Sequence, residues 1–385
     1  MFKADINDLL AAFQKTKEGS AWKSSTQRFE SRLMENLIQL KEELENGTYA
    51  QAPFTEFVHS ERGKVRPIRA MCIRDRVVQR WLCDTVLIPA LRPKLIYDNG
   101  ASLEGKGVDF TRKRLMVHLQ RHARKYGSKG WILLMDFSKY FDNIDHQIVL
   151  ERLKAFPELQ PYFLLIAKMI HSFSYDVSYG IDPDAPFDSM LHRKKIKEGA
   201  LQNGSIILER SLGIGSQISQ ILGVWLPTPI DNLCKCRFGI KGYGRYMDDL
   251  YAVHIDRDFL FNKVVPEINA KAKELKIFIN PRKTRICRLD REFVFLKQKY
   301  RMKPSGRILV HSPAVPFIRM RRKAGKFRNL MNAGRMSIAS IADAYLSWLG
   351  NAERMHSNGA KISRTNQILI ETFESRIGEQ YGKCA

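Results

Sequence analysis

Three aspartates have the type and spacing needed for metal-dependent chemistry. Asp136 directly follows an apolar run of five residues, and Asp248 and Asp249 follow Tyr246 and Met247 much further along the chain. Carboxylate oxygens are the ligands that Mg²⁺ prefers in proteins. Transfer of a nucleotidyl group uses two such cations about 4 Å apart, which bind the attacking and leaving oxygens. The three aspartates therefore predict a two-metal site, provided that the fold brings both segments together.

Two short elements must position these carboxylates. The apolar run 131–135 is typical of a buried strand, and residues 242–253 predict two strands joined by a tight turn at Asp248 and Asp249. Each half is ambiguous by itself, because an Asp-Asp pair is often a solvated turn and a core strand can end in a capping aspartate. The two halves together favour a catalytic site.

Helical periodicity predicts most of the remaining elements. Helices are expected at 29–44, 74–91, 108–126, 146–171 and 259–275. Strands are expected on either side of a turn at 61–64 and, as a strand–turn–strand unit, at 277–289. Asp142 and Asp145 favour a structural role, such as capping the helix that follows, and His146 has the same interpretation.

The composition favours a polyanionic partner. Lys and Arg number 64 against 40 Asp and Glu, so the formal net charge is +24. Seven Lys or Arg lie between Arg112 and Lys129 and nine between Arg301 and Leu330, and neither segment contains an acid. Phosphate neutralisation and counterion release reward such a surface. A basic face that only aids solubility is the alternative.

The cysteines and the hydropathy indicate a reduced protein without membrane contact. The six cysteines include one C-x-C, at Cys234 and Cys236, and form no paired cluster typical of zinc sites or disulfide frameworks. No apolar run approaches membrane-spanning length, and the N-terminus does not resemble a signal peptide. We expect a cytoplasmic protein.

Several motifs, in one order, resemble those of reverse transcriptases. The palm motifs of that family are similar to LLMDFSKYFDNID, around Asp136, and to YMDD at 246–249. Its fingers, palm-helix, basic and primer-grip motifs are similar to GKVRPIRAMCIRDRVVQR, SLGIGSQISQ, INPRKT and FVFLKQKY. These motifs cover most of the chain up to Tyr300. The resemblance implies an RNA-directed DNA polymerase that uses dNTPs.

The resemblance also implies roles for individual residues. Asp136, Asp248, Asp249 and the backbone carbonyl of Phe137 would hold Mg²⁺, for which Mn²⁺ can substitute, and Lys283 would protonate pyrophosphate. Positions implied at the incoming nucleotide are Lys64, Arg66, Phe141, Ile214 and Gly215. Positions implied at the template–primer are Ser219, Gln220, Tyr246 and Met247.

Some of these roles have simpler alternatives. The two basic residues of the fingers could be solubilising charges of a hairpin. Phe141, which would exclude a 2′-hydroxyl from the sugar site, could be an ordinary core aromatic. Lys283 is flanked by Arg282 and Arg285, so the basic role could belong to a neighbour.

The palm helix departs from the widespread Gln-Gly-x-x-x-Ser-Pro pattern. Here Ile214 replaces the Gln, and Ser219 is followed by Gln220. This pattern resembles the reverse transcriptases of diversity-generating retroelements. Because Ile214 offers only apolar contact to the incoming nucleotide, we expect modest fidelity, with errors concentrated at template adenines.

The implied fold is α+β, a right-hand polymerase with an antiparallel palm sheet. We expect N-terminal helices and fingers at 1–130, a palm at 131–300 and a basic helical thumb at 301–385. Within the palm, the polar segment 174–210 predicts an irregular insertion, with a hairpin as the alternative. The thumb would hold an RNA–DNA hybrid by its shape and phosphates.

Two biological contexts stay open. The palm-helix pattern favours a diversity-generating retroelement, whereas the insertion at 174–210 is compatible with an antiphage defence enzyme. In either context a structured non-coding RNA would supply template, primer or both, and a retroelement would add a small basic accessory protein. Template-independent synthesis also stays open. A non-catalytic RNA-binding scaffold is disfavoured, because all three metal carboxylates are present.

Overall fold

The computed structural model describes residues 3–61, 64–176, 207–213, 215–353 and 359–381. The chain forms two compact units. The first consists of residues 1–115, 133–252 and 258–285, and the second of 116–132, 253–257 and 286–385. Among the described residues, none of the helices is both long enough and apolar enough to cross a bilayer. The domain boundaries expected from the sequence stay a prediction.

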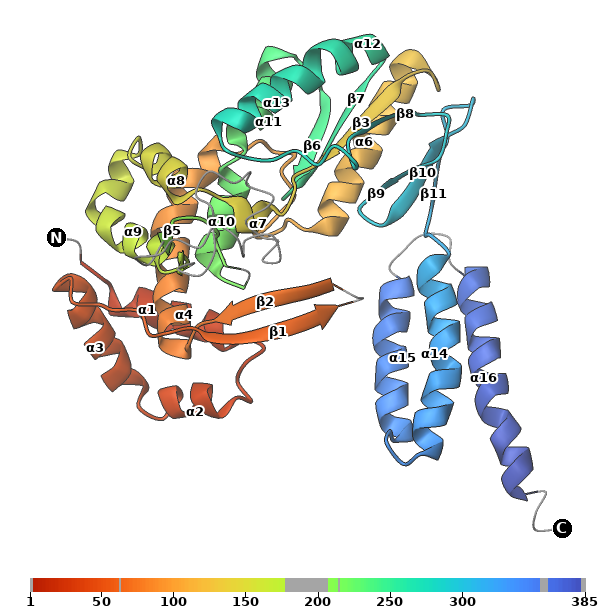
Figure 1. The fold of residues 1–385 in the computed structure, drawn as a ribbon, viewed down its shortest axis with the longest axis horizontal. Coiled ribbons are helices and arrows are strands. Elements are labelled where there is room, and N and C mark those ends of the chain that lie inside the picture. Colours follow the sequence, from red (N-terminus) through yellow and green to blue (C-terminus); the bar gives the residue numbers. More distant parts are fainter. Residues whose placement is uncertain (1–2, 62–63, 177–206, 214, 354–358, 382–385) are drawn as a thin grey trace, which may run out of the picture. The chain divides into compact units, whose positions relative to one another are not determined.

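The first unit begins with helices and one hairpin (Figure 1). These elements are α1 (Ile6–Lys17), α2 (Ser24–Glu30), α3 (Leu33–Glu45), β1 (Thr55–Glu61), β2 (Lys64–Ala70), α4 (Ile73–Leu82) and α5 (Ile88–Leu91). Strands β1 and β2 pair antiparallel with Glu61 opposite Lys64, which confirms the predicted turn. The predicted helix at 29–44 is instead divided between α2 and α3.

A four-stranded sheet joins strands that lie far apart in the sequence. Its order is β6-β7-β3-β8, with β3 at Trp131–Asp136, β6 at Gly242–Tyr246, β7 at Asp249–His254 and β8 at Arg285–Arg288. All residues of β3 after Trp131 are buried, which explains its continuous apolar run, because a central strand is covered on both faces. The end of β3 lies beside the start of β7.

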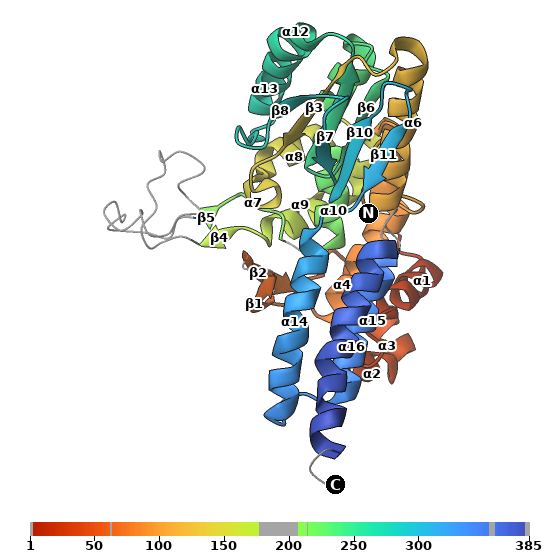
Figure 2. The ribbon, with the colours of Figure 1, turned by 90° about the vertical axis from the view of Figure 1, so that its right-hand side faces the viewer.

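Helix α13 lies along one side of this sheet (Figure 2), and further helices come before and between its strands in the sequence. The α-helices between residues 108 and 274 are α6 (Val108–Tyr126), α7 (Tyr140–Asn143), α8 (His146–Leu153), α9 (Phe163–His171), α10 (Gln217–Trp225), α11 (Thr228–Asn232), α12 (Arg257–Phe259) and α13 (Val265–Glu274), among the described residues. Strands β4 (Tyr175–Asp176) and β5 (Ile207–Leu208) pair antiparallel at the two ends of the predicted insertion. Most of that insertion, 177–206, lies outside the described residues.

The second unit ends in three helices. Strands β9 (Phe293–Phe295), β10 (Gln298–Met302) and β11 (Ile308–His311) form an antiparallel sheet. Helices α14 (Val315–Asn332), α15 (Ile338–Glu353) and α16 (Gly359–Tyr381) follow. Met320, Phe327 and Ile341 form a buried cluster between α14 and α15. The predicted α+β fold class is confirmed.

Candidate active site

The fold brings the three predicted aspartates together at one end of the palm sheet. Asp136 ends β3, Asp248 lies in the β6–β7 turn and Asp249 begins β7. The backbone N–H of Phe137 donates to the carbonyl of Asp248, with an N–O distance of 3.2 Å. The charges of Asp136 and Asp248 both act on the carboxyl group of Asp249. The pairing of β3 with β7 therefore places Asp136 close to Asp248 and Asp249.

The loop after β3 is fixed by the segment before β8. The carbonyl of Asp136 accepts from the N–H of Asn280 (2.8 Å), and the N–H of Ser138 donates to Phe278 (2.7 Å). The predicted first strand of 277–289 is only a single bridge, between Phe137 and Ile279. This segment closes onto the loop by a few hydrogen bonds without continuing the sheet.

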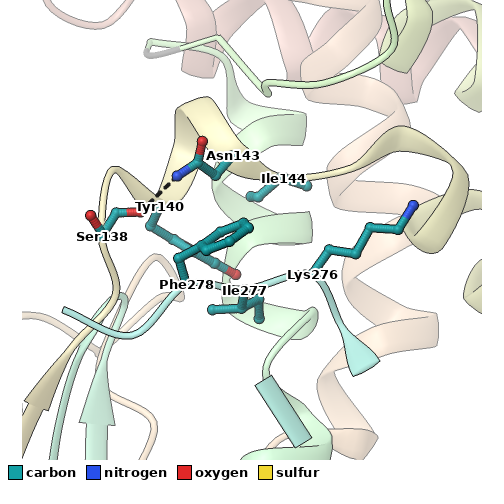
Figure 3. Close-up of a pocket in the computed structure, with 7 residues that line it drawn as sticks. All are labelled: Ser138, Tyr140, Asn143, Ile144, Lys276, Ile277 and Phe278. Atoms are coloured by element: carbon teal, nitrogen blue, oxygen red, sulfur yellow. Dashed lines mark hydrogen bonds between the residues drawn. The ribbon is translucent and has the colours of Figure 1, made fainter. Parts of the chain in front are cut away.

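Side chains fill the space behind this loop (Figure 3). The amide of Asn143 donates to the carbonyl of Ser138 at 3.0 Å. Tyr140, Ile277 and Phe278 line a hollow there that has no room for a water molecule. This hollow is packing that stiffens the loop, and no substrate can occupy it.

Negative charge accumulates at the three carboxylates. Burial, followed by the charges of Asp248 and Asp136, raises the pKa of Asp249 to about 7. Burial and the charge of Asp136 also raise the pKa of Asp248. Lys283 is a cation in contact with the cluster, with its Nζ 2.8 Å from Oδ1 of Asp136. Burial lowers the pKa of Lys283, but the contact with Asp136 outweighs it and the net shift is upward.

The donor set suits a hard divalent cation. Among the residues described, no three Asp, Glu, His or Cys side chains already surround a common cation position. Asp136 instead pairs its two oxygens with Lys283 and, at 3.4 Å, with the amide of Asn280. Carboxyls whose pKa values are raised by burial and by one another's charge gain from positive charge, and carboxylate oxygens are ligands that Mg²⁺ prefers. Asp136, Asp248 and Asp249 would hold the cation, with the ammonium of Lys283 beside them.

The predicted nucleotide pocket is partly described. Phe141 is half-buried against α10, where a Cβ added at Gly223 would lie 3.0 Å from its ring. Gly215 has φ +106°, a conformation that suits glycine. The side chains of Lys64 and Arg66 on β2, and all of Ile214, lie outside the described residues.

The predicted template–primer residues lie on two elements. Ser219 is buried in α10 and Gln220 is exposed. Ser216 caps α10 by accepting the N–H of Ser219 (3.4 Å) and donates to the buried Gln79 of α4 (2.7 Å). Tyr246 and Met247, by contrast, are half-buried around the β6–β7 turn. Helix α10 is therefore anchored to α4, the helix that follows the β1–β2 hairpin.

Nearby polar residues have the structural roles predicted for them. Asp145 caps α8 by accepting the N–H of Ile148 at 3.1 Å. His146 is buried, and its Nε2 lies 2.6 Å from the carbonyl of Ser211. Burial lowers the pKa of His146, so the ring is neutral at pH 7. Neither residue contacts the three carboxylates of the candidate site.

The sequence alone did not indicate Arg245 and Asp231, a fully buried ion pair beside the site. The available signal was an arginine inside an otherwise uncharged strand, since β6 reads Gly-Tyr-Gly-Arg-Tyr. Charged residues are seldom fully buried unless they are paired.

An α+β fold whose central sheet carries three converging aspartates is the arrangement expected of a polymerase palm. A sequence profile described as "Reverse transcriptase (RNA-dependent DNA polymerase)" matches residues 57–306. The chain therefore belongs to the reverse transcriptase family, whose members are RNA-directed DNA polymerases that generally use divalent metal ions.

The chain is also similar to proteins of known sequence or structure. The chain is 24% identical over 298 residues to Protein YkfC of Escherichia coli (strain K12). The matched region covers 69% of this chain and 71% of YkfC. A telomerase from Candida albicans, solved in complex with a fragment of telomeric RNA, is similar with a TM-score of 0.44 and 15% identity. That similarity covers 74% of this chain and 52% of the telomerase chain, so this chain spans about half of it.

Proposed function

We propose that this chain synthesises DNA on an RNA template by nucleotidyl transfer, with Mg²⁺ held by Asp136, Asp248, Asp249 and the carbonyl of Phe137. The observation that carries the proposal is the convergence of the three carboxylates, where burial and mutual repulsion raise the pKa of Asp249 to about 7. Such a cluster attracts divalent cations. When bound, they would activate the primer 3′-hydroxyl and neutralise the leaving pyrophosphate.

The side chains around the cluster have separate tasks in this proposal. Lys283 lies against Asp136 as a protonated ammonium, so it can give a proton to pyrophosphate. The ring of Phe141 packs on Gly223 and has no space to withdraw toward α10, so it excludes a 2′-hydroxyl. Lys64 and Arg66 on β2 bind the triphosphate.

The natural template is proposed to be a structured non-coding RNA. Helix α14 carries six Lys or Arg and no acid, which suits the phosphates of an RNA–DNA hybrid held by shape. A basic surface of this kind binds any duplex, so the identity of the RNA depends on contacts beyond this helix.

We place the enzyme in a diversity-generating retroelement, where a small basic accessory protein would assist it. The pattern from Gly215 to Gln220, with Ile214 before it, supports this context and modest fidelity. An antiphage defence enzyme is the second candidate, favoured by the long segment between β4 and β5.

Primer extension on an RNA template with Mg²⁺ and dNTPs tests the proposal. Wild type should extend the primer, Asp248→Asn should not, and Asp8→Asn should extend normally, because Asp8 is exposed on α1. Extension without template would indicate template-independent synthesis. If wild type fails even with co-purified cellular RNA, a non-catalytic RNA-binding scaffold becomes the better reading.

A further inference from the structure

Arg245 and Asp231 form a two-pronged ion pair in the interior of the palm. Both side chains are fully buried. Nε of Arg245 donates to Oδ1 of Asp231 at 2.8 Å and Nη2 donates to Oδ2 at 2.6 Å. The hydroxyl of Tyr243 donates to the same Oδ1 at 2.7 Å. The pair thus joins β6 to α11 through a carboxylate that accepts three hydrogen bonds.

The guanidinium of Arg245 also holds two backbone carbonyls. Nη2 donates to Val224 of α10 at 2.7 Å, and Nη1 donates to Met247 in the β6–β7 turn at 2.8 Å. Met247 has φ +55°, a left-handed conformation that costs free energy for a residue other than glycine. Asp248 follows it directly, so the direction of the Met247 carbonyl sets where the turn presents Asp248.

A buried ion pair does not usually make a folded protein more stable than an apolar pair would. Moving two charges from water into the interior costs free energy, and an apolar pair of similar volume is often as stable or more stable. Apolar side chains could not donate to the carbonyls of Met247 and Val224. What Arg245 adds over an apolar residue is therefore this pair of directed hydrogen bonds.

We propose that Arg245, held by Asp231, is a positioning residue of the active site. It fixes the left-handed turn at Met247, so that Asp248 and Asp249 keep one placement relative to Asp136. The turn is then held on both sides, because the N–H of Phe137 donates to the Asp248 carbonyl. This inference rests on the proposed function, since it concerns the same three carboxylates.

The double variant Arg245→Met with Asp231→Leu separates positioning from folding. We expect a melting temperature only slightly below that of wild type: an apolar pair replaces the ionic one, but the carbonyls of Met247 and Val224 lose a donor. We expect Mn²⁺ binding, followed by electron paramagnetic resonance, to weaken about tenfold to a hundredfold, as happens when partners that orient metal ligands are removed. The Mg²⁺ concentration for half-maximal primer extension should rise in parallel.

Tyr243→Phe is the matched control. It removes one hydrogen bond to Asp231 but leaves the contact between Arg245 and Met247, so it should lower the melting temperature without changing Mn²⁺ affinity. Arg245→Lys keeps the charge but loses the fork, and should bind Mn²⁺ more weakly than wild type. If the double variant melts far below wild type, the Mn²⁺ affinity of Arg245→Lys becomes the deciding measurement.

Two outcomes identify which idea has failed. Wild-type Mn²⁺ affinity in a well-folded double variant, or in Arg245→Lys, would overturn the positioning role and leave the polymerase proposal standing. If wild type itself neither binds Mn²⁺ nor extends a primer, the proposed function fails first.

Discussion

Replacing Asp249 by Asn should stabilise the cation-free protein and abolish its metal-dependent stabilisation. Burial, with the neighbouring charges of Asp248 and Asp136, raises the pKa of Asp249 from 3.8 to about 7. The folded state therefore binds a proton that the unfolded state has released between these two pH values. The free energy of unfolding of wild type must fall as pH rises from about 4 through about 7. Asn cannot ionise, so the free energy of unfolding of the variant does not fall in this way.

The size of the effect follows from the shift. Three pKa units correspond to about 4 kcal/mol, and because Asp249 is partly exposed we expect about half of this at pH 8. An unfolding entropy of about 2.1 cal/mol/K per residue gives about 0.8 kcal/mol/K for a chain of 385 residues, so 1 kcal/mol changes the melting temperature by about 1 °C. Asp249→Asn should therefore melt about 2 to 3 °C above wild type at pH 8 in a chelator, by the same arithmetic. At pH 4.5 the two proteins should melt together.

Thermal melts from pH 4.5 to 8, with chelator and with Mn²⁺, test this reasoning. Mn²⁺ should raise the melting temperature of wild type at pH 8 and leave Asp249→Asn nearly unchanged, because the cation binds only the ionised cluster. Asp8→Asn, an exposed change on α1, should show no pH-dependent gain. Equal pH profiles of wild type and Asp249→Asn in chelator would refute the argument that burial and neighbouring charges raise the pKa of Asp249.

Three further changes test the nucleotide pocket. Phe141→Ala should raise rNTP incorporation relative to dNTP, measured by single-nucleotide extension, and unchanged discrimination would make Phe141 a core aromatic. Lys283→Ala should slow single-turnover extension by about 10²- to 10⁴-fold, the range for a general acid, while Arg282→Ala should change it little. Ile214→Gln should lower the error rate at template adenines by product sequencing, and equal error rates would contradict the fidelity argument.

The sequence predicted the elements whose signals are local. The pairing of β1 with β2, in which Glu61 lies opposite Lys64, and helix α6 at 108–126 agree with the prediction, since turn residues and apolar spacing act over a few positions. The helix at 29–44 was predicted as one because its apolar spacing continues throughout. The side-chain amide of Asn36 instead donates a hydrogen bond to the carbonyl of Phe29 at 2.8 Å, and the Phe29 ring stacks on Phe13 of α1. Tertiary contacts of this kind leave no local signal.

The candidate site divides in the same way. The convergence of Asp136 with Asp248 and Asp249 could be predicted, because both segments carry strand signals that end in carboxylates. The partnership of Arg245 with Asp231 could not, since it depends on β6 and α11 meeting in space. A lone arginine in a strand is compatible with an edge position facing water, and only the structure places it inside.

The charge of Arg245 acts only weakly on the three carboxylates of the candidate site. Its guanidinium is paired with a fully buried carboxylate, and among the influences on the pKa of Asp248 it ranks below burial, Asp136 and Lys283. A geometric role and an electrostatic role therefore predict different behaviour. If Arg245 acts through geometry, the Arg245→Met and Asp231→Leu double variant should keep the wild-type loss of stability between pH 4.5 and 8 in chelator while binding Mn²⁺ more weakly. If it acts through charge, the pH profile and the affinity should change together, because the same field would govern proton and cation at these carboxylates.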